Sequence, residues 1–306
     1  MEHVDSDESD ESDESDESDE SGAVVVQPVG LIWSANFFCT VQRTCTSRPL
    51  QLPRLWLLRL REFPNSGQTC SRLRIRVAPA QGLVVVCRGD VGLLAFYFPD
   101  REEEWDRLCT AGFLGNFYPL EDPLRLEAPK TGRSHTFTNA EAAFQALKFW
   151  DRAEEFEKLT GSQAFSKKKG LQGLEDFTYG GFGSNWSGML HVLRAKFRPG
   201  TAMSQRLQLT GEAYLLEHNA RAGRDKIWSD NSSGDGLNWL GLQLMLVREE
   251  HRAATPWTDW IQEHVNLANG QVDQAWQDSV AMAVSALDQA LASARQENQG
   301  ASARSN

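Results

Sequence analysis

The stretch TNAEAAFQALKFW, residues 138–150, constrains the fold more than any other part of the sequence, because it predicts a helix that is apolar on most of its faces. Such a helix has to be buried inside a domain. Glu141, Gln145 and Lys148 fall on one narrow stripe of this helix, at about 100° per residue. A polar stripe usually faces solvent, but the apolar character of the other faces favours an internal site here.

Glu141 also has an interpretation that involves no chemistry. Thr138, followed three residues later by Glu141, is typical of a capping box, in which each side chain bonds to the backbone at the start of the helix. On this stretch alone we favour capping over catalysis. One side chain can also do both.

Charge is distributed along the chain in blocks, although the net charge is −11. Residues 1–22 hold twelve acids and no Lys or Arg, residues 23–90 are rich in Arg with a charge of +7, and residues 91–306 carry −6. The first block contains a repeat of Ser, Asp and Glu without apolar side chains, so we expect a disordered acidic tail. The mildly acidic main body argues against a broad face for duplex DNA.

Cysteine usage and hydropathy indicate an intracellular chain. The five cysteines all precede residue 110 and form no C-x-x-C pair, which is typical of reduced thiols. The acidic start is the opposite of a secretory signal, and the apolar run at 83–98 is broken by Arg88 and Asp90. We therefore expect a cytoplasmic or nuclear protein with no membrane span, no metal and no cofactor.

Signals for ordered elements begin near residue 83. The predicted helices lie at 139–159, 186–198, 237–250, 257–264 and 272–295, with a helical turn in DREEEWDRL and a helical segment that ends at Thr210 and Gly211. The predicted strands lie at 83–88, 91–98 and in EAYLLEHN. These elements predict an α+β fold, a mostly helical single domain with a small β-sheet.

The same signals divide the chain into four parts. Residues 1–22 are the acidic repeat, and residues 23–82 are an Arg-rich leader for which the sequence predicts no fold. Residues 83–255 form the predicted catalytic domain, and residues 256–306 form a helical extension and a polar tail.

A Gly-rich loop and the helix after it indicate a place for an anionic ligand. The loop YGGFGSN precedes the helix at 186–198, and a helix N-terminus favours anions. Lys196 shares one face of that helix with Met189 and Val192, so its ammonium either extends to solvent or meets an anion. Trp186 at the helix start is either a core residue or a ring that lines an open site.

Six motifs in sequence order resemble those of the NADAR, or YbiA-like, family. They span about residues 93–252, and they are FYFP at 96–99, FLGNFYP at 113–119, EAAFQALKF at 141–149, NWSGMLHVLRAKF at 185–197, LTGEAYLLEH at 209–218, and GRDKIW at 223–228 followed by LNWLGLQLMLVRE at 237–249. The resemblance implies a YbiA-like fold for this region. It does not cover the acidic repeat, the Arg-rich leader or the C-terminal helix.

The resemblance implies an N-glycosidase that cleaves the bond between ribose C1′ and a nitrogen. The substrate is either a phosphorylated riboflavin-pathway intermediate or ADP-ribose attached to guanine in nucleic acid or nucleotides. Matching motifs assign Glu141, Trp186 and Asp225 to residues that the family is thought to need. This chain departs from the usual family form at Gly115, which is usually Ser, and in WSDNSSGDG, where a WGxG loop is usual. The second departure leaves the substrate preference open.

The residue types fit this chemistry. Hydrolysis through an oxocarbenium-like state needs a carboxylate near C1′, a group that activates water or the leaving group, and groups that hold phosphates. The resemblance also implies that Asn116, Phe117 and Tyr118 lie in a ligand-contacting segment. From the resemblance and the chemistry together we predict three catalytic residues, Glu141, Asp225 and Lys148, and six substrate-binding residues, Asn116, Phe117, Tyr118, Trp186, Lys196 and Trp228. The predicted partner is an ADP-ribosyl or phosphorylated ribosyl substrate, with ADP-ribosylated nucleic acid as one form. The alternative is an ADP-ribose-binding module without turnover.

Overall fold

The computed structural model of the chain describes residues 74–76, 90–99, 103–252 and 256–304. The acidic repeat 1–22, most of the leader 23–82 and the predicted strand at 83–88 lie outside these described residues. All described residues belong to one compact unit. Helices make up most of it, with two small sheets, so the predicted α+β class is confirmed.

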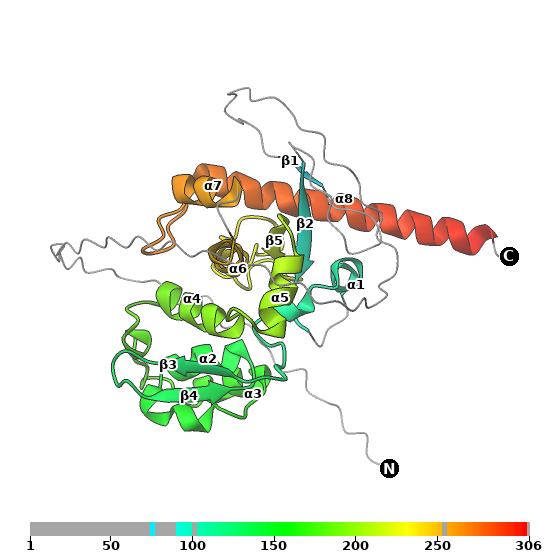
Figure 1. Cartoon of the computed structure of the whole chain (residues 1–306). Coiled ribbons are helices and arrows are strands. Elements are labelled where there is room, and N and C mark those ends of the chain that lie inside the picture. Colours follow the sequence, from blue (N-terminus) through cyan, green and yellow to red (C-terminus); the bar gives the residue numbers. More distant parts are fainter. Residues whose placement is uncertain (1–73, 77–89, 100–102, 253–255, 305–306) are drawn as a thin grey trace, which may run out of the picture. The chain divides into compact units, whose positions relative to one another are not determined.

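A three-stranded parallel sheet forms the first part of the core (Figure 1). Its order is β1 (Arg74–Arg76), β2 (Asp90–Phe96) and β5 (Tyr214–Glu217), and Leu93 pairs with Tyr214. Residues 92–96 of β2 are all buried, as expected for a parallel strand that is covered on both faces. The strand expected at 91–98 and the one expected in EAYLLEHN are therefore confirmed.

Helices cover this sheet. α6 (Trp239–Glu250) packs on β5, while α8 (Gln274–Arg304) runs along β1, β2 and β5 (Figure 1). α1 (Glu104–Cys109) contacts β2 and α8, and α7 (Pro256–His264) contacts α6 and α8.

Indole hydrogen bonds tie the C-terminal helices to the rest of the core. Trp276 on α8 is fully buried, and its Nε1 donates to the carbonyl of Leu237 at 2.8 Å. Trp239 at the start of α6 donates through Nε1 to the carbonyl of Gly270 at 2.9 Å. The segment predicted as an extension, 256–306, thus contributes to the same hydrophobic core as the helices before it.

A second group of elements packs around α2 (Ala140–Leu147). α2 contacts α3 (Gly161–Lys169) and α4 (Asn185–Lys196), and α4 also contacts α6. An antiparallel hairpin, which the sequence did not predict, packs on these helices: its strand β3 (Leu124–Glu127) contacts α4, and its strand β4 (Ser134–Phe137) contacts α2. The remaining elements are α5 (Ala202–Leu209) and the short 3-10 turns η1 (Gly112–Leu114), η2 (Trp150–Glu155) and η3 (Tyr179–Gly181).

The helix predicted at 139–159 is wrong in its length. α2 ends at Leu147, and Phe149 leaves helical geometry with φ −140° and ψ 48° before η2 begins. This break turns the Phe149 ring onto Phe156, where the two rings stack 6.0 Å apart and are buried. Tertiary packing of an aromatic pair therefore overrides the local helix preference.

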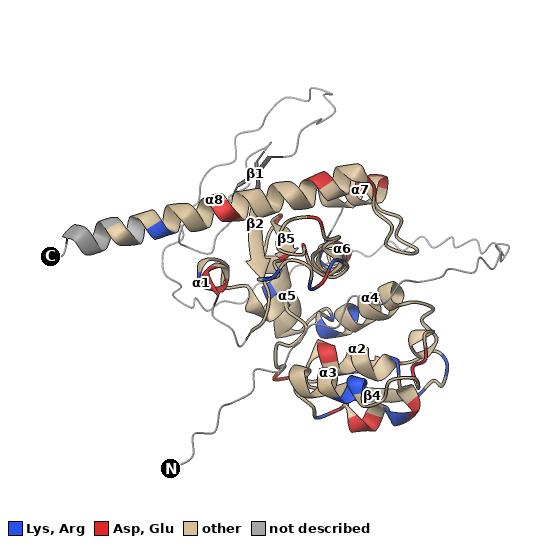
Figure 2. Cartoon of the chain, turned by 180° about the vertical axis from the view of Figure 1, so that it is seen from behind, with Lys and Arg blue, Asp and Glu red and all other residues tan. Residues whose placement is uncertain are grey.

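The surface of this part of the fold carries both charge signs. Figure 2 shows acidic and basic residues interspersed around α3 and β4, and Lys167 pairs with Glu155 at 2.6 Å. Among the helices that the structure describes, none combines the length and the apolarity that a membrane crossing requires.

Candidate active site

The polar stripe of α2 does not face solvent. Glu141, Gln145 and Lys148 are only 6%, 4% and 5% exposed, although all three are polar or charged. Gln145 Nε2 donates to Glu141 Oε1 at 2.8 Å, so the two side chains are held together along one face of the helix. The stripe is therefore an internal feature of the fold, as predicted.

The capping box predicted for Thr138 and Glu141 is wrong. The N-cap is Asn139, whose Oδ1 accepts from the backbone N–H of Ala142 at 2.8 Å. Thr138 instead donates through Oγ1 to the carbonyl of Leu159. Asn139 is the N-cap because its extended backbone places the carboxamide over the first turn of α2. The Glu141 carboxylate is therefore not needed as a cap.

The segment 114–118 lies beside the start of α2. The carbonyl of Asn116 accepts from the backbone N–H of Glu141 at 3.0 Å. The side-chain Oδ1 of Asn116 is buried without a hydrogen-bond partner, as is Oε1 of Gln145. Two buried acceptors that lack donors thus belong to residues that each hydrogen-bond to Glu141, Asn116 through its backbone and Gln145 through its side chain. This is the expected state of groups that meet a ligand.

Aromatic packing fixes the rest of this segment. The ring of Phe117 meets Phe98 edge-on, with centroids 4.5 Å apart, and it also covers Gly161, where a Cβ would lie 2.3 Å from the ring. Tyr118 is held by Arg206, whose Nη1 donates to the phenol oxygen at 2.9 Å.

Gly115 has a steric explanation. A Cβ at this position would lie 2.5 Å from the carbonyl oxygen of Tyr97, so a serine cannot be accommodated without a shift of the backbone. The segment 113–117 therefore approaches the end of β2 more closely than a chain with serine at 115 can.

Asp225 and Trp228 lie on the loop between β5 and α6. Asp225 Oδ1 accepts from the backbone N–H groups of Ile227 and Trp228, both at 2.9 Å. Burial raises the pKa of the Asp225 carboxyl, while these two N–H donors and the nearby Arg224 act in the opposite direction.

Trp228 connects this loop to α2. Its ring meets Phe144 edge-on at 5.4 Å, one helical turn after Glu141. Arg224 lies with its guanidinium 5.7 Å from the ring centroids of Tyr97 and Phe98. Because Phe98 also packs on Phe117, the loop that carries Asp225 is joined both to α2 and to the segment that carries Asn116.

Lys148 lies at the other end of the stripe, at the C-cap of α2. Its ammonium is 5.6 Å from the ring centroid of Phe144 and 5.7 Å from that of Tyr179. The two rings stack on each other at 5.6 Å. Such a cation over aromatic faces adds a positive charge to the same helix that carries Glu141.

Two predicted substrate-binding residues are placed differently. Trp186 is 1% exposed: its Nε1 donates to the carbonyl of Leu267 at 3.0 Å, and Gly270 and Trp239 cover the ring. No ring face is accessible, so the stacking of a substrate base on Trp186 is corrected to a core role. Gly270 and Trp239 lie far from Trp186 in the sequence, so the local pattern around Trp186 did not indicate that its ring is buried.

Lys196 is also corrected. Its ammonium is buried and donates to the backbone carbonyls of Leu114 and Gly115 at 3.1 and 2.7 Å, instead of meeting an anion. Burial lowers the pKa of Lys196 to about 7, and Arg206 adds to this shift. Lys196 therefore holds the segment that carries Asn116 in place through two backbone carbonyls.

Sequence reasoning missed four residues that hold the arrangement together, which are Tyr97, Phe98, Phe144 and Arg224. All four fall inside the motifs at 96–99, 141–149 and 223–228, so the motifs contained the signal. Among the described residues, no group of three His, Cys, Asp or Glu side chains is placed to hold a metal ion.

Comparison with known proteins agrees with the placement of these motifs. Residues 97–252, just over half of the chain, match the NADAR domain. A riboflavin biosynthesis protein of Vibrio vulnificus is 30% identical over 170 residues, which cover 53% of this chain and 39% of that protein. The N-glycosidase YbiA of Escherichia coli is 31% identical over 122 residues, which cover 38% of this chain and 71% of YbiA.

The solved NMR structure of Escherichia coli YbiA aligns with 57% of this chain and 91% of its own, at 24% identity and a TM-score of 0.38. The match to the domain over residues 97–252 includes Asn116, Glu141, Lys148, Asp225 and Trp228. The chain belongs to the NADAR domain family.

Proposed function

We propose that this protein is an N-glycosidase that hydrolyses the bond between ribose C1′ and a nitrogen. The observation that carries the proposal is the buried Glu141 carboxylate, with unpartnered acceptors on Asn116 and Gln145 beside it. The name of the YbiA relatives supports the same class of reaction. The finer proposal is that the substrate is ADP-ribose on a guanine-type base or a phosphorylated ribosylamine.

The chemistry assigns a role to each group. Water attacks C1′, the C1′–N bond breaks with its electron pair going to nitrogen, and the nitrogen gains a proton. Glu141 stabilises the positive charge that develops at C1′ and takes the proton from water. Asn116 Oδ1 and Gln145 Oε1 accept hydrogen bonds from ribose hydroxyls, which would satisfy both atoms.

The remaining residues hold the two ends of the substrate. Asp225 orients water or a ribose hydroxyl, and Trp228, partly exposed and packed against Phe144, supports the sugar or base. Lys148 supplies positive charge for a phosphate, seven residues or about 10 Å along the helix from Glu141. Phe117 and Tyr118, on the segment before α2, are assigned to contact the substrate.

A product assay tests this proposal. Wild-type protein is offered ADP-ribosylated guanine and a phosphorylated riboflavin-pathway ribosylamine in parallel, and release of the free sugar is measured. Glu141→Gln keeps an acceptor for Gln145 and is expected to lower turnover by about 10² or more with the fold intact. Glu154→Gln, an exposed carboxylate on η2, is the matched control and should leave turnover unchanged.

The outcomes separate the two functions that the sequence allowed. A wild-type protein that binds ADP-ribose and releases no sugar from either substrate is a binding module without turnover. Equal rates for wild type and Glu141→Gln would remove Glu141 from the chemistry.

A further inference from the structure

The loop between β5 and α6 is anchored to the sheet by Asp230. Asp230 is fully buried, and its Oδ2 lies 2.6 Å from Nδ1 of His218 while Oδ1 accepts from the backbone N–H of Asn219 at 3.0 Å. Its own backbone N–H donates to the carbonyl of Glu217 at 3.0 Å. The middle of the loop is therefore fixed at the end of β5, before any contact with a ligand is considered.

Asn231 joins the two ends of the same loop. Its Oδ1 accepts from the backbone N–H of Gly223, and its Nδ2 donates to Asp235 Oδ1, both at 2.7 Å. Asn231 is 2% exposed and has a left-handed φ of 57°, which asparagine tolerates better than most residues. One carboxamide thus links a residue before Asp225 to a residue ten positions after it.

Ser229 connects Asn231 to the backbone of Asp225. The Ser229 hydroxyl is buried, donates to the backbone carbonyl of Asp225 at 2.7 Å and accepts from the backbone N–H of Asn231 at 3.0 Å. Asp225 is therefore held on its upstream side through Gly223 and on its downstream side through Ser229.

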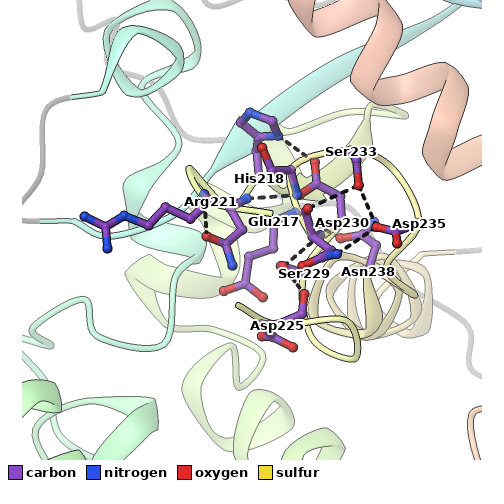
Figure 3. A network of polar contacts seen from close by, with 12 residues as sticks. Glu217, His218, Arg221, Asp225, Ser229, Asp230, Ser233, Asp235 and Asn238 are labelled. Atoms are coloured by element: carbon purple, nitrogen blue, oxygen red, sulfur yellow. Dashed lines mark hydrogen bonds and ion pairs between the residues drawn. The ribbon is translucent and has the colours of Figure 1, made fainter. Parts of the chain in front are cut away.

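The two oxygens of the Asp225 carboxylate differ as a result. Oδ1 accepts the N–H groups of Ile227 and Trp228, and the N–H of Ser229 also favours the carboxylate, while no side chain among the described residues donates to Oδ2. Figure 3 shows Asp225 at the edge of the network, with its side chain directed away from Asp230 and Asp235. A small movement of the Asp225 backbone would change where Oδ2 points, and a misplacement of about 1 Å costs enzymes as much as a hundredfold in rate.

We propose that Ser229 and Asn231 are positioning residues for Asp225, which set the direction of its Oδ2 through the loop backbone without touching the substrate. This inference rests on the proposed function for the role of Asp225. It also has a consequence that does not require turnover, because the N–H groups of Ile227 and Trp228 stay bound to Asp225 only while the loop keeps its shape.

The kinetic test uses three single variants of the full chain. Ser229→Ala removes both bonds of the hydroxyl, and Asn231→Gly removes the carboxamide while it keeps a left-handed φ possible. Ser233→Ala is the control, because its exposed hydroxyl bonds to Asp235 and Asn231 in the same loop but not to Asp225. With the substrate that wild type cleaves, we expect kcat to fall by about tenfold or more in the first two variants, with KM nearly unchanged, and no change in the control.

Amide hydrogen exchange provides the second readout. The N–H groups of Ile227 and Trp228 are expected to exchange faster in Ser229→Ala and Asn231→Gly than in wild type and Ser233→Ala, while amides in α6 stay protected. If wild type cleaves no substrate, the proposed function is wrong, and the exchange rates still decide whether these residues hold Asp225. Unchanged exchange at both amides, or lower melting temperatures with an unchanged kcat per folded molecule, would overturn the positioning role.

Discussion

Replacing Lys196 with Met is predicted to remove a pH-dependent part of the free energy of unfolding. The Lys196 ammonium is enclosed between α4 and the carbonyls of Leu114 and Gly115, and its pKa falls from the ordinary 10.5 to about 7 on folding. Both the neutral amine and the ammonium can donate to these two carbonyls. The loss of its proton therefore does not break the two hydrogen bonds.

The sign and the size of the effect follow from this shift. Because the pKa is lower in the folded state, the unfolded chain binds more protons between pH 7 and 10.5, and this group makes the fold more stable as pH rises through that interval. One pKa unit corresponds to about 1.4 kcal/mol. Between pH 7 and 9 the gain is about 2 kcal/mol, because the folded-state amine is already half deprotonated at pH 7.

Urea unfolding of wild type and Lys196→Met at pH 7, 8 and 9 measures this effect. Met leaves the Leu114 carbonyl without the Lys196 donor, while the Gly115 carbonyl keeps the backbone N–H of Tyr118. The lost donor lowers stability by about 1 to 3 kcal/mol at every pH, so the informative quantity is the change with pH. The difference between the two proteins should move by about 2 kcal/mol over this range. Lys158→Met, at an exposed lysine, is the matched control. Parallel pH dependences for wild type and Lys196→Met would refute the reasoning.

Three further predictions concern stability. Asn139→Ala should lower the free energy of unfolding by about 1 kcal/mol in urea titrations with turnover retained, since the cap is Asn139 and not Glu141; a large loss of turnover at unchanged stability would contradict this. Trp186→Ala should lower the free energy of unfolding by about 3 to 5 kcal/mol in urea titrations, because the ring is buried. The affinity of the folded fraction for ADP-ribose, measured by calorimetry, should stay the same. Weaker binding at wild-type stability would restore the stacking role. Deletion of residues 1–22 should leave the melting temperature and turnover unchanged, because the repeat at 5–21 has no apolar side chain; a drop in either would show that it docks on the domain.

Local signals were sufficient to predict most of the elements. The helix at 237–250 and the strand in EAYLLEHN were found because their apolar residues have a clear period and their ends carry stop signals. The break after Leu147 was not found, because it depends on the packing of Phe149 against Phe156. The parallel pairing of β2 with β5 joins residues about 120 positions apart, and no local pattern specifies such a pair.

In the candidate site, too, some residues could be predicted from local sequence signals and others depend on contacts between distant parts of the chain. Glu141 could be selected because a carboxylate in an apolar helix is unusual, whereas Asp225 lies in an ordinary loop and was selected only because its motif resembles that of the family. The burial of Trp186 could not be predicted, because the residue that bonds its indole, Leu267, lies 81 positions away. The partners of Lys196 are likewise backbone carbonyls. Because every residue has a backbone carbonyl, the sequence does not indicate which of them Lys196 contacts.

The indole hydrogen bonds to the C-terminal segment limit where a shortened fragment of this protein can end. The match to the NADAR domain ends at residue 252, yet Trp186 and Trp239 donate to carbonyls at Leu267 and Gly270, beyond that boundary. A recombinant fragment that stops at 252 would expose apolar surface of two large rings and remove the carbonyls to which their N–H groups donate. Fragment boundaries for crystallisation or screening should therefore follow the core and include α7 and α8, even though the match to the NADAR domain stops before them.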